Sequence, residues 1–197
     1  MGFSNEGQVW TVSEFEAYVK TVTKPAWVDS ICLHHTGVPS LAQRPSGLTA
    51  QHIKNIRYYY ETTKKWSSAP HLFIDDDQIF GMCPLTEKGV HAKSFNSRAI
   101  GIEVLGNYNE EAPNNGRGLA CWTTAFGAVK ALVSWAGLKP DATNILFHRD
   151  DPKTNKTCPG SKVEKSWVLE NLQTSYLDST NWHGPNGGGP GRFANYA

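Results

Sequence analysis

No run of eighteen consecutive apolar residues occurs in this 197-residue chain, so the sequence predicts no membrane-spanning helix. Net charge is almost absent as well, because 19 lysines and arginines are balanced by 18 aspartates and glutamates. A formal charge of +1 gives no net attraction toward DNA or toward an anionic membrane. The composition therefore disfavours nucleic acid as a partner and excludes membrane insertion.

Residues 1–20 lack the basic start and the apolar run of a Sec-type signal peptide. We therefore expect synthesis in the cytoplasm without a signal peptide. The length suits one core of ordinary size and leaves little for a second. We predict an N-terminal extension with a short helix over residues 1–26 and one catalytic domain over 27–179. A flexible tail rich in glycine and proline is predicted over 180–197.

Cysteine is scarce, and the four cysteines lie far apart without the regular spacing of a disulfide scaffold. We predict three unpaired thiols and one metal ligand. Cys32 and Cys121 lie in apolar segments, where free cysteine is usually a small buried hydrophobic residue. The remaining two are Cys83 and Cys158.

Hydrophobic periodicity predicts an α/β domain, a central mixed β-sheet flanked by helices. Polar residues follow the strand ends, which places a site at one edge of the sheet. The predicted helices cover 13–20 with Ser13 as cap, 49–62 with Thr49 as cap, 123–136 before Gly137, and a segment after Pro159 that buries Val163, Trp167 and Leu172. The predicted strands cover 27–35, a hairpin of 71–75 and 78–83, a central strand buried on both faces over 99–105, and 145–147.

Two segments carry imidazole and thiol groups, the side chains that zinc binds best. One runs from His148 to Cys158, where Lys156 and a following helix start are expected to lower the thiol pKa. A thiolate of this kind serves either metal binding or nucleophilic attack, and zinc is the better fit. The other segment is the strand that ends in His34 and His35. Strand alternation lets only one of these two histidines face a metal.

We choose His34 as the third ligand, because the Thr-Gly turn leaves His35 near the rim of the site. Three protein ligands leave a fourth zinc position for water, whose pKa zinc lowers to around 7. Glu103 interrupts an aliphatic strand and either faces solvent on an edge strand or accepts a proton from that water. Lys156 is either a solvated loop lysine or a group that stabilises an oxyanion.

Four motifs occur in the order of a known family. They are His-His-Thr after a hydrophobic strand, Ala69-Pro-His-Leu-Phe-Ile-Asp, Gly89-Val-His-Ala-Lys-Ser-Phe-Asn-Ser-Arg-Ala-Ile-Gly-Ile-Glu, and His148 through Cys158-Pro-Gly. From about residue 27 to 172 the chain resembles the type 2 N-acetylmuramoyl-L-alanine amidases, a zinc family of phage lysins, bacterial muropeptide amidases and peptidoglycan recognition proteins.

The resemblance implies a zinc hydrolase that cleaves the amide between the lactyl group of N-acetylmuramic acid and L-alanine. It implies His34, His148 and Cys158 as ligands, Glu103 as base and Lys156 as the oxyanion partner. The expected partner is peptidoglycan or a muropeptide, bound by a monomeric enzyme.

One departure from the family pattern is Pro70, which stands where some phage amidases have a catalytic tyrosine. A tyrosine role therefore cannot be carried over, and Glu103 is expected to carry more of the proton transfer. His91 matches a family position that lines the substrate groove, and we expect it to bind substrate together with His35 and His71.

Several functions remain open. A phage-type endolysin that reaches the cell wall after release is preferred over a cytoplasmic enzyme that recycles muropeptides. A non-catalytic peptidoglycan-binding module would be marked by loss of the cysteine ligand, and Cys158 is present. A cysteine peptidase with Cys158 or Cys32 as nucleophile is the third alternative, which metal chelation would distinguish.

Overall fold

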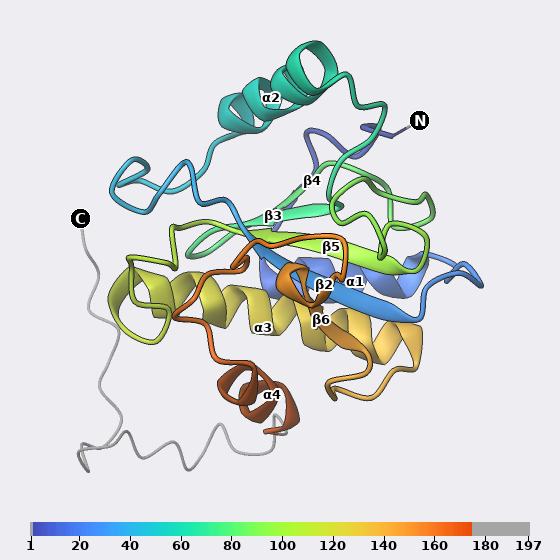
Figure 1. The fold of residues 1–197 in the computed structure, drawn as a ribbon. Helices are drawn as coiled ribbons and strands as arrows, with labels where there is room; N and C mark the ends of the chain where they lie inside the picture. The colour runs from blue at the N-terminus through green and yellow to red at the C-terminus, as the bar shows by residue number, and fades with distance from the viewer. Residues whose placement is uncertain (1, 175–197) are drawn as a thin grey trace.

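The sheet holds six strands in the order β1-β4-β3-β5-β2-β6, as the computed structural model of residues 2–174 shows (Figure 1). The pairs β3/β5, β5/β2 and β2/β6 are parallel, whereas β3/β4 and β1/β4 are antiparallel. The predicted mixed α/β sheet is therefore confirmed. The strands are β1 (Val9–Trp10), β2 (Ser30–His35), β3 (Leu72–Ile74), β4 (Ile79–Gly81), β5 (Ala99–Val104) and β6 (Ile145–Phe147).

Helices cover both faces of the sheet. Helices α1 and α3 pack on one face, α2 lies over the other, and α4 lies on the outer side of α3 (Figure 1). The α-helices are α1 (Val12–Thr21), α2 (Ala50–Tyr59), α3 (Gly116–Ala136) and α4 (Lys165–Gln173), and two short turns are η1 (Tyr60–Lys64, π-helical) and η2 (His148–Asp150, 3-10).

Helix α3 is the core helix of the domain. Its length and composition alone would allow it to cross a membrane, but about half of it is buried inside the domain, where it packs against α1 and the sheet. It begins at Gly116, so the predicted start at Thr123 was seven residues late. The apolar repeat is weak over the Gly-Arg-Gly start of the helix, where Arg117 instead pairs with Asp76. The predicted end at Gly137 is confirmed, since this glycine has a φ of 65°.

The N-terminal segment contributes to the same core. Trp10, Phe15 and Val19 are buried, and the ring of Trp10 stacks on Tyr18 at 4.6 Å. The cap of α1 is Thr11, not Ser13, because Thr11 and Glu14 form a reciprocal capping box. A capping box fixes the first turn of a helix, so this helix is well defined at its start.

Other predicted boundaries shift by a few residues. The first long strand begins at Ser30 rather than Trp27, and both strands of the hairpin are shorter than predicted. Thr49 does cap α2, but the α-helix ends at Tyr59 and continues as the π-helical turn η1. The predicted tail over 180–197 lies outside the described residues.

Alternation along β2 and β5 decides what each face of the sheet carries. Ile31 and Leu33 share one face of β2 and belong to the main core, together with side chains of α1 and α3. Cys32 belongs to a separate small apolar cluster on the opposite face, with Phe95 and Ala99. The face that carries Cys32 also carries His34, and its parallel partner in β5 is Glu103. The candidate site therefore lies on the face of α2, at the carboxyl ends of β2 and β5.

Candidate active site

A cavity of about 380 Å³ opens where β2, β5 and β6 end. It brings together residues that are more than a hundred positions apart in sequence. Its polar lining includes all five residues predicted for catalysis or metal binding, His34, Glu103, His148, Lys156 and Cys158.

The three predicted ligands lie at distances that suit a metal ion. His34 Nδ1 is 3.1 Å from His148 Nδ1 and 3.7 Å from Cys158 Sγ. Two nitrogens bound to a tetrahedral zinc at about 2.0–2.1 Å are separated by about 3.3 Å, and a nitrogen and a sulfur at about 2.3 Å by about 3.6 Å. The two measured separations are close to these values. The ligand atoms of His34, His148 and Cys158, which all lie within 4.8 Å of one another, therefore suit a single zinc ion.

Cys158 is positioned by a loop rather than by a helix. Arg149 holds this loop, since its backbone N–H donates to the Cys158 carbonyl at 2.8 Å and its guanidinium donates to the carbonyls of Gly160 and Val163. Helix α4 begins only at Lys165, so the predicted helix start beside the thiol is wrong. Burial raises the pKa of the Cys158 thiol, so metal binding must displace a proton from the sulfur.

Glu103 lies beside the candidate ligands and inside the sheet. Its Oε1 is 3.9 Å from His34 Nδ1, and its side chain is 13% exposed. Strand β5 has β3 and β2 as neighbours, so the alternative of a solvent-facing edge strand does not hold. Burial raises the pKa of Glu103 to about 8, against the opposing effect of the Lys156 cation. A carboxyl group with this pKa can both accept and release a proton near neutral pH.

The remaining predicted histidines occupy three different settings. His35 lines the cavity from the other side of β2, and its Nδ1 accepts the backbone N–H of Tyr108 at 3.0 Å. His71 is fully buried in the sheet, where its Nδ1 accepts the Gly101 N–H and its Nε2 donates to the Glu87 carbonyl. Both ring nitrogens of His71 are thus occupied by backbone, and the expected substrate contact does not fit this placement.

His91 is also buried, against the expectation that it faces substrate. Its Nδ1 is 3.1 Å from His34 Nε2, and its own Nε2 is 3.1 Å from the Ala99 carbonyl. The ring forms part of the cavity wall, but both of its nitrogens are occupied by protein groups. His91 therefore contacts the candidate ligand His34 directly.

An aromatic wall at the cavity was not predicted from the sequence. Tyr59, Tyr60 and Trp66 line the cavity, and Tyr60 stacks on Trp66 with ring centroids 5.0 Å apart. Burial and the nearby charge of Glu103 raise the pKa of the Tyr60 hydroxyl. The signal available in the sequence was the run of three tyrosines at the end of α2, and π-helical turns such as η1 often mark functional sites. Pro70 also lines the cavity and offers no hydroxyl there.

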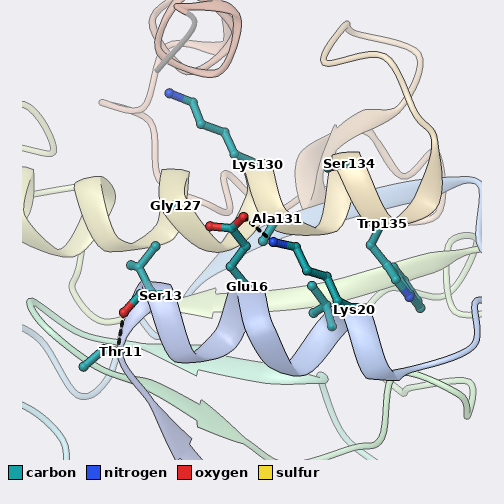
Figure 2. A pocket seen from close by; sticks show the side chains of 11 residues that line it. Thr11, Ser13, Glu16, Lys20, Gly127, Lys130, Ala131, Ser134 and Trp135 are labelled. Carbon is teal, nitrogen blue, oxygen red and sulfur yellow. Dashed lines mark hydrogen bonds and ion pairs between the residues drawn. The ribbon is translucent and has the colours of Figure 1, made fainter. Parts of the chain in front are cut away.

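A larger cavity, of about 890 Å³, lies between α1 and α3 (Figure 2). Its wall combines apolar side chains with the exposed ion pair of Glu16 and Lys20. None of the residues that line it is a histidine or a cysteine. Size alone therefore does not identify the reactive site, and the chemistry lies at the smaller cavity.

A mixed sheet with two histidines, a cysteine and a buried glutamate at its parallel strand ends defines an α/β domain with a candidate metal centre. A family model described as N-acetylmuramoyl-L-alanine amidase matches residues 23–161, and the chain belongs to this family. That range includes β2 and all five residues named above as candidates for catalysis or metal binding.

Relatives and solved structures agree with this assignment. The N-acetylmuramoyl-L-alanine amidase of Mus musculus is 26% identical over 133 residues, which are 66% of this chain and 24% of the mouse protein. The peptidoglycan-recognition protein SC2 of Drosophila simulans is 29% identical over 66% of this chain and 67% of that protein. The endolysin amidase LysCS of Clostridium intestinale is 25% identical with a TM-score of 0.57, over 77% of this chain and 90% of that one. The chain thus spans about a quarter of the mouse protein's length.

Proposed function

We propose that this protein is a zinc-dependent N-acetylmuramoyl-L-alanine amidase. The observation that carries the proposal is the set of His34, His148 and Cys158, whose ligand atoms are spaced for one zinc ion, beside the buried carboxyl group of Glu103. The family membership of residues 23–161 supports the amide between N-acetylmuramic acid and L-alanine as the bond that is cleaved.

Different residues of the chain have different roles in amide hydrolysis. A zinc ion bound by the three ligands would supply Lewis acidity and lower the pKa of water. Glu103, which lies beside the three ligands, accepts the proton of the attacking water and returns it to the leaving nitrogen. The Lys156 ammonium, at the same cavity, stabilises the negative charge that develops on the carbonyl oxygen.

An extended substrate has room to bind. A second cavity of about 450 Å³ shares Val38, Pro39, Ile56 and Tyr59 with the first, so the two are adjacent beside α2. Val38 is 81% exposed and Tyr59 is 45% exposed, although both are large apolar side chains. Exposed apolar side chains beside a polar centre suit a ligand that combines a sugar with a peptide. Peptidoglycan or a muropeptide has this chemistry.

Among biological roles we propose a phage-type endolysin that acts as a monomer on the cell wall after release. The endolysin LysCS, to which the chain is similar over most of its length, supports this choice. A cytoplasmic amidase that recycles muropeptides is the alternative. Turnover of intact sacculi compared with soluble muropeptides distinguishes the two, because a lysin must act on the insoluble polymer and a recycling enzyme must prefer the fragments.

The proposal is tested by metal analysis together with release of L-alanyl peptides from purified peptidoglycan. One zinc per chain is expected, and Cys158→Ser should lose most of the metal and of the activity because a hydroxyl is a far poorer zinc ligand. His34→Ala should lose zinc as well. His35→Ala is the matched control and should keep zinc, because His35 lies on the other side of the strand. A protein that cleaves peptidoglycan equally well with and without a chelator would overturn the proposal.

A further inference from the structure

We propose that His91 is a positioning residue that fixes the tautomer of His34, by accepting its Nε2 proton and so leaving Nδ1 unprotonated and directed at the metal position. The role in metal binding rests on the proposed zinc site. The hydrogen bond itself can be tested without metal and without substrate.

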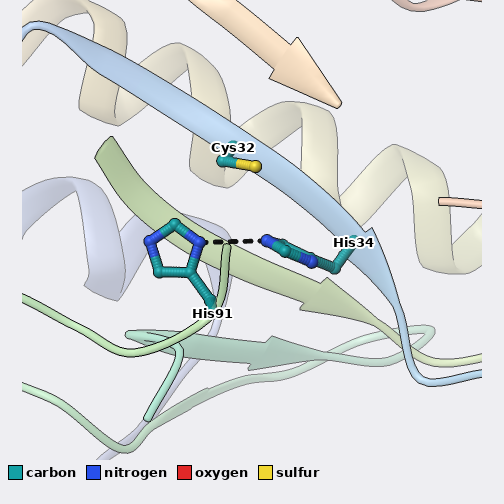
Figure 3. Close-up of side chains that lie close together, drawn as sticks. All are labelled: Cys32, His34 and His91. Atoms are coloured by element: carbon teal, nitrogen blue, oxygen red, sulfur yellow. Dashed lines mark hydrogen bonds between the residues drawn. The ribbon is translucent and has the colours of Figure 1, made fainter. Parts of the chain in front are cut away.

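His34, His91 and the Ala99 carbonyl form a series of two hydrogen bonds, and Figure 3 shows the one between the histidines. The direction of both bonds follows from the carbonyl at the end of the series. His91 Nε2 lies 3.1 Å from the Ala99 carbonyl, which can only accept, so this nitrogen carries the proton. A neutral imidazole has one N–H, so His91 Nδ1 has a lone pair and accepts from His34 Nε2 at 3.1 Å. His34 then has no proton on Nδ1, the atom that faces His148 and Cys158.

Burial keeps both imidazoles in the neutral form that this arrangement requires. His34 is 1% exposed and His91 is 7% exposed. A metal-bound histidine usually donates its other N–H to a carboxylate, a carbonyl or water. Here a second histidine fills that place.

The same reasoning decides what the cluster of Cys32, His34 and His91 does. Their potential ligand atoms lie within 4.8 Å of one another, close enough to suggest a second metal site (Figure 3). However, His34 Nε2 carries a proton and the lone pair of His91 Nδ1 accepts it. Only the Cys32 sulfur would remain as a donor, and it lies among apolar side chains. We therefore assign this cluster to hydrogen bonding and not to metal binding.

The chain holds the His91 ring in place from two sides. The backbone N–H of His91 donates to the Asn96 side chain at 2.8 Å. On the other side the ring lies against Gly101 of β5, where an added Cβ would come within 2.5 Å of His91 Cγ. The absence of a side chain at Gly101 therefore makes room for the ring. Such a rigid setting keeps the His34–His91 geometry fixed.

The first test is nitrogen-15 NMR of the imidazoles in chelator-treated full-length protein. We expect His34 as the Nε2–H tautomer, with a scalar coupling across the hydrogen bond to His91 Nδ1. A His34 ring protonated on Nδ1, or an absent coupling in a well-folded sample, would overturn the proposal. This measurement involves neither zinc nor peptidoglycan, so it can fail or succeed independently of the proposed function.

The second test is zinc affinity measured by competition with a chromogenic chelator. His91→Leu removes the acceptor and should weaken zinc binding about 10- to 100-fold, the usual effect of losing such a partner. His91→Gln retains an acceptor oxygen and should recover most of the affinity. His35→Gln is the matched control, since this neighbouring histidine does not contact His34 Nε2, and it should bind zinc like the wild type.

Three outcomes would speak against the role in metal binding. They are wild-type affinity in a folded His91→Leu protein, equal losses in His91→Leu and His91→Gln, or a wild-type protein that binds no zinc. If His91→Leu fails to fold, the comparison of His91→Gln with wild type and the NMR tautomer decide the question. A protein that binds zinc as described but leaves peptidoglycan intact would overturn the proposed function alone.

Discussion

Burying the carboxyl group of Glu103 in a central strand costs free energy. A chemical role explains why the protein keeps a carboxyl group there. Glu103→Gln keeps the shape of the side chain but cannot accept a proton. We expect zinc content and thermal stability to persist while release of L-alanyl peptides falls about 10²- to 10⁴-fold, the usual scale for loss of a general base. Steady-state turnover of purified peptidoglycan measures the effect. A near wild-type rate would remove this carboxylate from the mechanism.

Pro70 offers no hydroxyl group to the cavity, and we expect the hydroxyl group of Tyr60 to take part in catalysis instead. Tyr60 lines the cavity close enough to Glu103 to be affected by its charge. Tyr60→Phe keeps the stacking on Trp66 and removes only the hydroxyl, so a fall in kcat of at least about tenfold with unchanged zinc content would show a role in proton transfer or charge stabilisation. Pro70→Ala is the control at the same wall and should change kcat little. Equal kcat values for wild type and Tyr60→Phe would leave this tyrosine as part of the wall alone.

Some residues of the candidate site could be predicted from the sequence, because strand alternation and the order of the motifs determine where their side chains lie. His34, His148 and Glu103 lie at ends or interruptions of strands and Cys158 follows in the loop after His148, and the structure brings all four together. The environment of His91 could not be predicted in this way. It depends on a contact between the 89–98 loop and β5, which no local pattern encodes.

The N-terminal elements β1 and α1 bury side chains in the same core as the central sheet, although the family match begins only at residue 23. Phe15 on α1 is fully buried and lies edge-on to Trp10 with ring centroids 5.5 Å apart. Phe15→Ala should lower the free energy of unfolding by about 3–5 kcal/mol, because it leaves a cavity in the core. Urea unfolding followed by tryptophan fluorescence measures this change.

A matched control for this helix is Glu16→Ala, on the exposed side of α1. Its ion pair with Lys20 is solvent-exposed and contributes little to stability. If Phe15→Ala were as stable as Glu16→Ala, the N-terminal helix would be an appendage that the rest of the domain does not need.

Element types were easier to predict than element ends. The predicted strands over 99–105 and 145–147 nearly coincide with β5 and β6, because short aliphatic runs between polar residues are strong signals. The start of α3 at Gly116 and the π-helical turn η1 depend on tertiary contacts instead. The Arg117–Asp76 ion pair, for example, joins the first turn of α3 to the hairpin.

Buried neutral histidines make the stability of the whole molecule depend on pH. His71 gives the clearest case, because it contacts none of the candidate ligands and its two ring nitrogens bond to backbone groups. Burial lowers the pKa of His71 from 6.5 to about 4 in the folded state. The unfolded chain therefore binds a proton near pH 6.5 that the folded protein does not take up until about pH 4. The contribution of His71 to stability therefore falls as the pH decreases through this range.

For His71 alone the linkage amounts to a loss of about 2 kcal/mol between pH 7 and pH 5. Urea unfolding at pH 7, 6 and 5, with a chelator present to exclude competition between protons and metal, measures the loss. His71→Gln should be less stable than wild type at pH 7, because an amide cannot reproduce both backbone bonds, yet its stability should decline by about 2 kcal/mol less toward pH 5. Parallel pH profiles for the two proteins would mean that His71 is already protonated, or open to solvent, in the folded state.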